Sequence, residues 1–188
     1  MSHDPALEAH EHTEHAAHAA GESNPLVARV VMSVAFLAVL ATAAGSLETV
    51  EGGLALNSTS EAVLWQDRAT DTWNEYQADS IKKHLYGIAA NAGGLNADRY
   101  RKSAKEFGDM QDKLRKTAKD DESDRDTLLS ASTTHEERHH WLTGSATLFE
   151  IGIAMSTVAI ITHANWLWLM AMAFGAAGIV LLGTAYFG

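Results

Sequence analysis

The chain alternates between long apolar runs and one long charged segment. Three almost uncharged runs, 30–47, 143–162 and 166–187, flank a centre that holds thirteen of the fourteen Lys and Arg residues and eighteen of the twenty-four Asp and Glu. The hydrocarbon core of a bilayer is about 30 Å thick, and a helix needs about 20 apolar residues to cross it. The pattern therefore predicts three transmembrane helices, 26–47, 143–162 and 166–187, with one polar segment inserted between the first and the second.

The first apolar run lacks the layout of a cleaved signal peptide. Such a peptide starts with a short basic region followed by roughly 7–15 apolar residues. Here an acidic, His-rich tail over residues 1–25 precedes a longer apolar run. We therefore expect this run to be an uncleaved membrane anchor.

The polar centre has the periodicity of two long helices joined by a glycine turn. Apolar residues recur at spacings of three and four over 62–76, and a second series with this spacing covers 100–142. Such spacing places them on one face of a helix. Gly93 and Gly94 can adopt positive φ and end the first helix, which predicts a turn near 91–97. The residues expected to pack the two arms together are Trp65, Trp73, Tyr76, Tyr100, Phe107 and Leu114.

The predicted fold is all-α, with three transmembrane helices and a long helical, coiled-coil-like hairpin over 48–142 between spans 1 and 2. Gln111, Asp121, Arg125 and Ser132 interrupt the apolar series of the second arm. Apolar residues at the a and d positions stabilise a coiled coil, so these polar residues weaken the contact away from the turn.

One run in the first arm carries a family resemblance. SEAVLWQDRATDTWNEYQADSIKKHLY (60–86), a charged helix, HHWL (139–142) and a third span containing WLW (166–168) together resemble the bacterial family catalogued as domain of unknown function 4337. The resemblance implies one span, a coiled-coil-like insert and two further spans. Many members carry a basic loop between the last two spans, where this chain has THAN (162–165). The family's activity is unknown, so the resemblance implies no mechanism. The most specific matching residues are Asp71, Trp73, Tyr76, Gln77, Ser80, Ile81, Lys82 and His84.

The charge of the chain limits its partners. A net charge of −10 argues against nucleic acid as a partner, because its phosphates require a basic surface. Membrane lipid is the expected surrounding of the three spans, and the chain itself or another integral membrane protein is the expected protein partner. No Cys is present, so the chain has neither disulfide bonds nor thiolate chemistry.

Basic residues near the span ends give a weak indication of orientation. Arg29 lies at the amino end of the first span, whereas Glu48 and Glu51 follow its other end. Basic residues close to a span favour the cytoplasmic side, so this distribution favours an extracytoplasmic hairpin. Arg138, just before the second span, favours the opposite arrangement. We expect a multi-pass protein of the bacterial inner membrane with the hairpin on the extracytoplasmic side.

Residues 135–139 read HEERH, which matches the H-E-x-x-H pattern of zinc peptidases. On a helix His135 and His139 are one turn apart and could both bind zinc, with Glu136 as general base. However, Arg138 is atypical inside such a motif, and no third ligand follows. The alternative is an amphipathic approach to the second span, with Trp141 as an aromatic anchor at the membrane surface.

The amino-terminal tail contains a second candidate metal site. If the tail is helical, His12, His15 and His18 share one face, with Glu8 and Glu11 nearby. Imidazole and carboxylate together bind Zn, Ni or Cu, so this arrangement predicts a weakly bound divalent metal. The alternative is a disordered or marginally helical acidic tail. No other cofactor is expected.

The second span contains one ionisable residue, Glu150. Carboxylates inside a membrane are costly and often functional. An ion pathway would need a polar partner at similar depth, and the other spans offer only Ser33, Thr42 and Thr184. The alternative is a carboxyl group that is protonated or hydrogen-bonded within a helix bundle or between protomers.

Small residues four positions apart recur in the spans and allow helices to approach closely in lipid. They favour either self-association or packing of the three spans within one chain. Trp141 and Trp166 lie at the expected span ends. The candidate membrane and packing residues are Glu150, Gly152, Ser156, Ala171, Gly175, Trp141 and Trp166.

These features favour a non-catalytic membrane scaffold or accessory subunit, which self-associates or docks to a larger membrane complex. The alternative is a homo-oligomeric channel or transporter that uses Glu150. A zinc-dependent membrane peptidase built on His135, Glu136 and His139 is a remote alternative.

Overall fold

The structure is a computed structural model that describes residues 25–187. It contains the helices α2 (Pro25–Asn91), α3 (Ala97–Thr162) and α4 (Asn165–Phe187), and no strand occurs within residues 25–187. The predicted all-α fold is confirmed. Proline occurs at the start of α2, where the missing N–H is tolerated, and nowhere later in the chain. Nothing in the backbone chemistry therefore interrupts the 67 residues of α2 or the 66 of α3.

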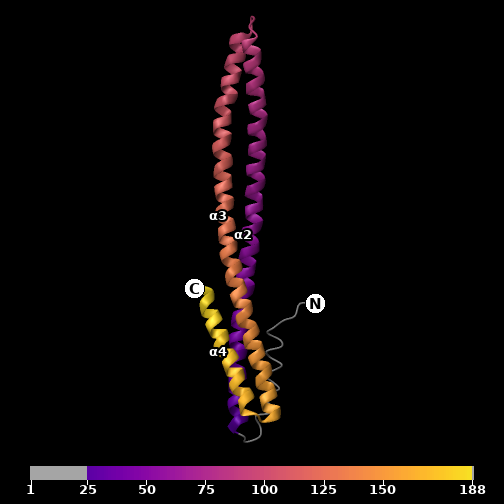
Figure 1. Cartoon of the computed structure of the whole chain (residues 1–188), viewed down its shortest axis with the longest axis vertical. Helices are drawn as coiled ribbons and strands as arrows, with labels where there is room; N and C mark the ends of the chain where they lie inside the picture. The colour runs from indigo at the N-terminus through magenta and orange to yellow at the C-terminus, as the bar shows by residue number, and fades with distance from the viewer. Residues whose placement is uncertain (1–24, 188) are drawn as a thin grey trace. The chain divides into compact units, whose positions relative to one another are not determined.

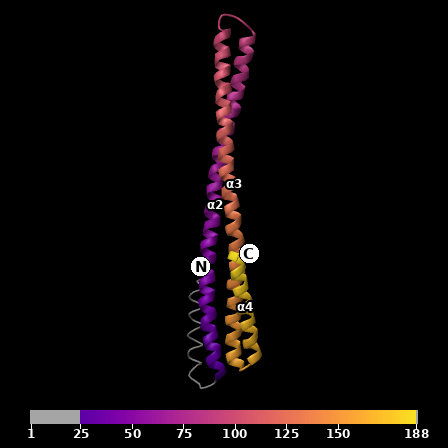
Figure 2. The same ribbon diagram turned by 90° about the vertical axis from the view of Figure 1, so that its left-hand side faces the viewer.

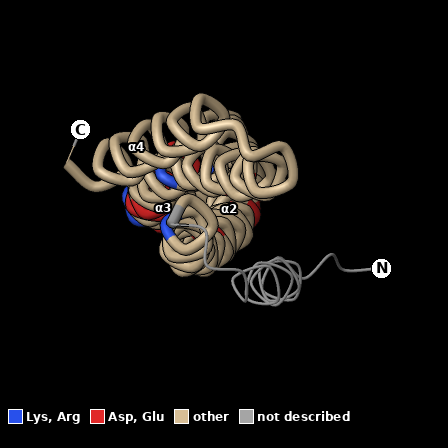
Figure 3. The backbone as a smooth tube through the Cα atoms, turned by 90° about the horizontal axis from the view of Figure 1, so that it is seen from below, with Lys and Arg blue, Asp and Glu red and all other residues tan. Residues whose placement is uncertain are grey.

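All three helices are long and apolar enough to cross a membrane. α3 and α4 are separated by a tight turn in which His163 has a φ of 51°, and the Leu167 N–H donates to the Ala164 carbonyl at 3.2 Å. α4 carries no charged residue and is uniformly tan in Figure 3. Hydropathy and length thus describe a multi-pass membrane protein.

The chain divides into two compact units. Within residues 25–187, the first consists of 25–55 and 133–187, and the second is Leu56–Ser132. We call the first unit the membrane module. The second unit is the hairpin, a name that from here on refers to Leu56–Ser132. Within the membrane module, α4 lies beside the adjoining part of α3 in both Figure 1 and Figure 2.

The core of the membrane module is formed by apolar side chains of α2 and α3. Small residues let the helices reach it: a Cβ on Gly175 would lie 2.6 Å from Leu37 Cδ2, and a Cβ on Gly152 would lie 3.1 Å from the Ala171 carbonyl oxygen. Gly152, Ser156, Ala171 and Gly175 are all buried. At these positions the small residues therefore pack the three spans of one chain against one another. This is one of the two interpretations of the pattern; the other is self-association. The buried core residues are Val30, Val34, Leu37, Ala38, Ala41, Ala44, Ala146, Phe149 and Ile153.

The hairpin packs through small buried residues with half-buried aromatic side chains around them. Tyr86 stacks on Phe107 with ring centroids 5.6 Å apart, and Trp73 meets Tyr76 edge-on at 5.3 Å. The Trp73 indole N–H also donates to the Glu122 carboxylate at 2.9 Å. The six residues expected to pack the arms, Trp65, Trp73, Tyr76, Tyr100, Phe107 and Leu114, are all half-buried.

The polar residues in the contact between the arms have partners across it. The buried Gln111 donates to the Tyr76 carbonyl at 3.4 Å and accepts from Lys83 Nζ at 3.3 Å. Thr59 and Ser132 share a hydrogen bond of 2.7 Å. Buried polar groups are costly when unpaired, and these pairs remove that cost.

The turn of the hairpin lies between Asn91 and Ala97. Gly93 and Gly94 have φ of 80° and 101°, a region in which a side chain is strained. The Gly93 N–H donates to the Ala90 carbonyl at 3.3 Å and the Ala97 N–H to the Gly94 carbonyl at 3.1 Å. The glycine pair thus reverses the chain where the sequence predicted a turn.

Candidate functional site

Polar side chains from all three helices converge in the membrane module, beyond the apolar part of α2. We call this group the end cluster. It consists of Glu48 and Glu51 from α2, His135, Arg138, His139 and Thr143 from α3, and Tyr186 from α4.

Glu51 is the central residue of the end cluster. Its side chain is 7% exposed, and its Oε2 lies 2.5 Å from His135 Nδ1. The Tyr186 hydroxyl donates to Oε1 at 3.2 Å, and Arg138 Nη1 lies 3.9 Å from the same oxygen. The Arg138 guanidinium also lies 5.5 Å from the centroid of the Tyr186 ring. A buried carboxylate requires such partners, so Glu51 links α2 to both α3 and α4.

A second contact of the end cluster joins His139 to the backbone of α2. His139 Nδ1 lies 3.1 Å from the Glu48 carbonyl oxygen, which can only accept, so Nδ1 carries the proton. The Thr143 hydroxyl lies 2.7 Å from Glu48 Oε1 and 2.9 Å from the His139 carbonyl oxygen. A Cβ on Gly52 would lie only 3.1 Å from His139 Nδ1, so glycine at position 52 permits this close approach.

The HEERH pattern lies within these contacts. His135 and His139 both direct Nδ1 toward α2, whereas Glu136 is exposed. Within residues 25–187, no group of three or more His, Asp or Glu residues is arranged to hold a metal ion. The geometry thus assigns both histidines a role in joining α2 and α3. The other candidate metal ligands, His12, His15 and His18, lie outside the described residues.

Glu150 lies on the exposed side of α3, away from the core of the membrane module. It forms no hydrogen bond or ion pair with any residue in the described part of the chain. Ser33, a possible partner at similar depth, accepts from the Trp168 indole at 3.1 Å and donates to the Arg29 carbonyl at 2.9 Å. Thr42 donates to the Ala38 carbonyl. Within the described chain, Glu150 therefore faces the surroundings of the helix bundle.

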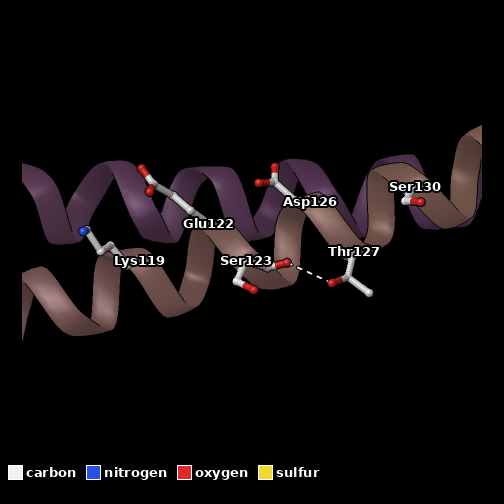
Figure 4. A pocket seen from close by; sticks show the side chains of 6 residues that line it. All are labelled: Lys119, Glu122, Ser123, Asp126, Thr127 and Ser130. Atoms are coloured by element: carbon white, nitrogen blue, oxygen red, sulfur yellow. Dashed lines mark hydrogen bonds between the residues drawn. The ribbon is translucent and has the colours of Figure 1, made fainter.

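Two of the surface hollows are lined wholly or partly by residues of α3. The first, on the hairpin, is lined by side chains from this one helix that spread along its surface (Figure 4). Because they do not converge, they form no enclosed binding site. The second adjoins the end cluster and is lined by residues of both α3 and α4, among them Arg138, Trp141 and Tyr186. Trp141 and Trp166, the two aromatic residues predicted to lie at the membrane surface, are both exposed.

Of the end cluster, only His135 and His139 were among the candidate site residues from the sequence, and the central contact between Glu51 and Tyr186 was not predicted. Glu51 entered only as a charge flanking the first span, and Tyr186 is separated from it by 135 positions. Tyr186 lies on an apolar helix with no charged residue near it in sequence. A short-range pattern could not have found this pair.

Comparison with known proteins gives one result. The family model described as "Domain of unknown function (DUF4337)" matches residues 27–188. No curated protein and no solved structure matches the chain.

Proposed function

We propose, from the premise that the chain belongs to the family described as domain of unknown function 4337, that it is a non-catalytic membrane scaffold or accessory subunit. It works as an assembly, with copies of itself or with a larger complex of integral membrane proteins. The end cluster supports a non-catalytic role, because the contacts of Glu51, His135 and His139 join the helices to one another.

The observation that carries this proposal is the position of Glu150. It lies seven residues beyond Thr143, or about 10 Å along the helix at 1.5 Å per residue, and it is exposed. A charged residue at the centre of a membrane helix costs roughly 2.5–3.5 kcal/mol on insertion scales. A polar group of a neighbouring protein would reduce this cost. Thr147 and Ala154, also exposed and close to Glu150 on α3, are small enough to let another helix approach.

The experiment is native mass spectrometry of the full chain released from a mild detergent. We expect a defined oligomer or a co-purifying membrane protein. Glu150→Leu should shift the midpoint of dissociation to at least tenfold higher protein concentration. Val180→Leu, an exposed substitution on α4 and therefore away from the face of α3 that carries Glu150, should leave it unchanged. A monodisperse wild-type monomer without a partner would overturn the proposal.

A second candidate function is a channel or transporter, which the exposed position of Glu150 also favours. In a ring of copies this face of α3 could line a central pore. Glu150→Gln would then change ion flux through proteoliposomes, because it removes the charge while keeping the shape. Unchanged flux would count against the channel.

We place the protein in the bacterial inner membrane with the hairpin outside the cytoplasm, on the basis of Arg29 at one end of the first span and Glu48 at the other. The cysteine-free chain allows a direct test with Leu95→Cys at the exposed turn. In intact spheroplasts, a membrane-impermeant maleimide should label this thiol. If the thiol is labelled only after lysis, the hairpin lies on the cytoplasmic side and the proposed orientation is wrong.

A further inference from the structure

One face of α2, close to the turn of the hairpin, is apolar and exposed. Ile81, Leu85 and Ile88 are 62%, 61% and 69% exposed, and Leu95 in the turn is fully exposed. Spacings of four and three separate the first three, and the series continues from Ala78 to Ala92, both also exposed. We call these residues the α2 stripe: Ala78, Ile81, Leu85, Ile88, Ala92 and Leu95.

The α2 stripe is distinct from the contact between the two arms. In the same part of α2, Asp79 and Ala90 are buried and Tyr86 is half-buried, stacked on Phe107 of α3. These residues lie on the opposite side of the helix from Ile81 and Ile88, as the 3.6-residue period requires. α2 therefore has two apolar faces here, and α3 covers only one of them.

The charged neighbours of the α2 stripe are directed away from it. Lys82 Nζ contacts Asp79 Oδ1 at 2.9 Å and lies 5.2 Å from the Phe107 ring centroid. Lys83 Nζ donates to Gln111 of α3 at 3.3 Å. Both lysines thus bind within the hairpin, and the polar residues that border the stripe, Gln77, His84 and Asn91, carry no fixed charge.

An uncharged apolar face suits a second copy of itself. In a two-fold contact each residue meets its own counterpart, so fixed charges on the face would repel one another. A partner with a charged surface, by contrast, could form no ion pair with the residues of the stripe. The spacing of four and three is the a/d pattern by which two helices interlock.

We propose that the α2 stripe is a contact between two copies of this chain, with the two α2 helices side by side and parallel. The direction follows from the first span, which belongs to the same unbroken helix and inserts identically in every copy. Confinement to one membrane raises the effective concentration of the copies, so a short stripe suffices. This inference rests on the proposed function, because it requires that the protein works as an assembly. It adds which surface forms the contact, the α2 stripe, and which protein is the partner, a second copy of this chain.

The absence of cysteine makes the contact directly testable by single thiols in the full chain. Ile81→Cys, Leu85→Cys and Ile88→Cys are compared in oxidised membranes with Met110→Cys. Met110 lies on α3 of the same hairpin and is 46% exposed. Parallel pairing predicts a disulfide-linked homodimer for each stripe variant, at least tenfold more abundant than for Met110→Cys.

Three results would overturn the inference. The stripe variants could link no better than Met110→Cys. Only Leu85→Cys could link, which is the result for antiparallel pairing about that residue. The linked species could have the mass of this chain plus a different protein.

A second measurement separates failure of the stripe from failure of the proposed function. Native mass spectrometry compares the wild type with a triple variant, Ile81→Glu, Leu85→Glu and Ile88→Glu, and with Met110→Glu. Dissociation of the triple variant alone, at unchanged helicity, supports the inference. If wild type and triple variant assemble equally, the stripe is refuted and the proposed function stands. A wild-type monomer without partners refutes both.

Discussion

Replacement of Glu51 tests whether the end cluster holds the membrane module together. Glu51→Ala removes the hydrogen bonds to His135 and Tyr186 and leaves the charge of Arg138 without this nearby carboxylate. A hydrogen bond to a charged group contributes about 1.5–3 kcal/mol, and a neutral one about 0.5–1.5 kcal/mol. The contact with His135 is short, and that with Tyr186 is at the long end of the normal range. We therefore expect Glu51→Ala to lower the free energy of unfolding by about 3 kcal/mol.

Glu51→Gln separates the geometry of the site from its charge. The Gln amide oxygen can accept from His135, and its NH2 group can donate to the Tyr186 oxygen, so both contacts survive in neutral form. Charge-assisted hydrogen bonds are roughly twice as strong as neutral ones. Glu51→Gln should therefore cost only about 1 kcal/mol.

The assay is the thermal unfolding midpoint of each full-length variant in the same detergent. For a protein of this size, 1 kcal/mol corresponds to roughly 2–4 °C. Glu51→Ala should thus lower Tm by about 6–12 °C and Glu51→Gln by about 2–4 °C. Glu61→Ala, an exposed substitution on the same helix, should have almost no effect. Equal midpoints for Glu51→Ala and Glu61→Ala would refute the assigned role.

Four further predictions concern buried positions in the membrane module and the HEERH pattern. Ser145→Ala should cost about 1 kcal/mol, because the buried hydroxyl donates to the Gly178 carbonyl at 2.8 Å. Ser156→Ala should cost nothing or stabilise, since its buried hydroxyl has no partner within residues 25–187, and the two Tm values report the difference. Gly178→Ala should cost about 1–3 kcal/mol, because its Cβ would lie 2.7 Å from a buried phenylalanine ring, whereas Gly183→Ala, with open space around it, should not lower Tm. Elemental analysis should find no stoichiometric zinc in the purified protein; bound zinc with proteolysis that Glu136→Gln abolishes would instead establish the peptidase.

The sequence predicted those parts of the fold that depend on local periodicity. Apolar length indicated the spans, and Gly93 and Gly94 indicated the turn, because each of these signals is contained within a few neighbouring residues. The end cluster depends on α3 and α4 approaching α2 at Glu51, over separations of 84 and 135 positions. No periodic pattern carries that information.

The HEERH pattern illustrates the same limit. Spacing along one helix shows that His135 and His139 share a face, and a shared face is compatible with either a metal or a facing helix. The deciding contacts come from α2: the carboxylate of Glu51 and the backbone carbonyl that Gly52 leaves accessible. Glycine at position 52 is a signal in the sequence, but its meaning depends on which residue faces it.

The surfaces left for assembly follow from what the fold already uses. Small residues at 152, 156, 171 and 175 are buried within the membrane module, so they are not available to another chain. Each unit has one exposed feature whose polarity is opposite to that of its surroundings. In the membrane module this is the Glu150 carboxylate on an apolar span, and in the hairpin it is the apolar α2 stripe on a charged segment. Neither feature stabilises a single copy, because one incurs a desolvation cost and the other leaves apolar area in water. Contact between copies would reduce both the desolvation cost of Glu150 and the apolar area that the α2 stripe exposes to water. Because one assembly accounts for both features, we propose an assembly rather than two unrelated sites.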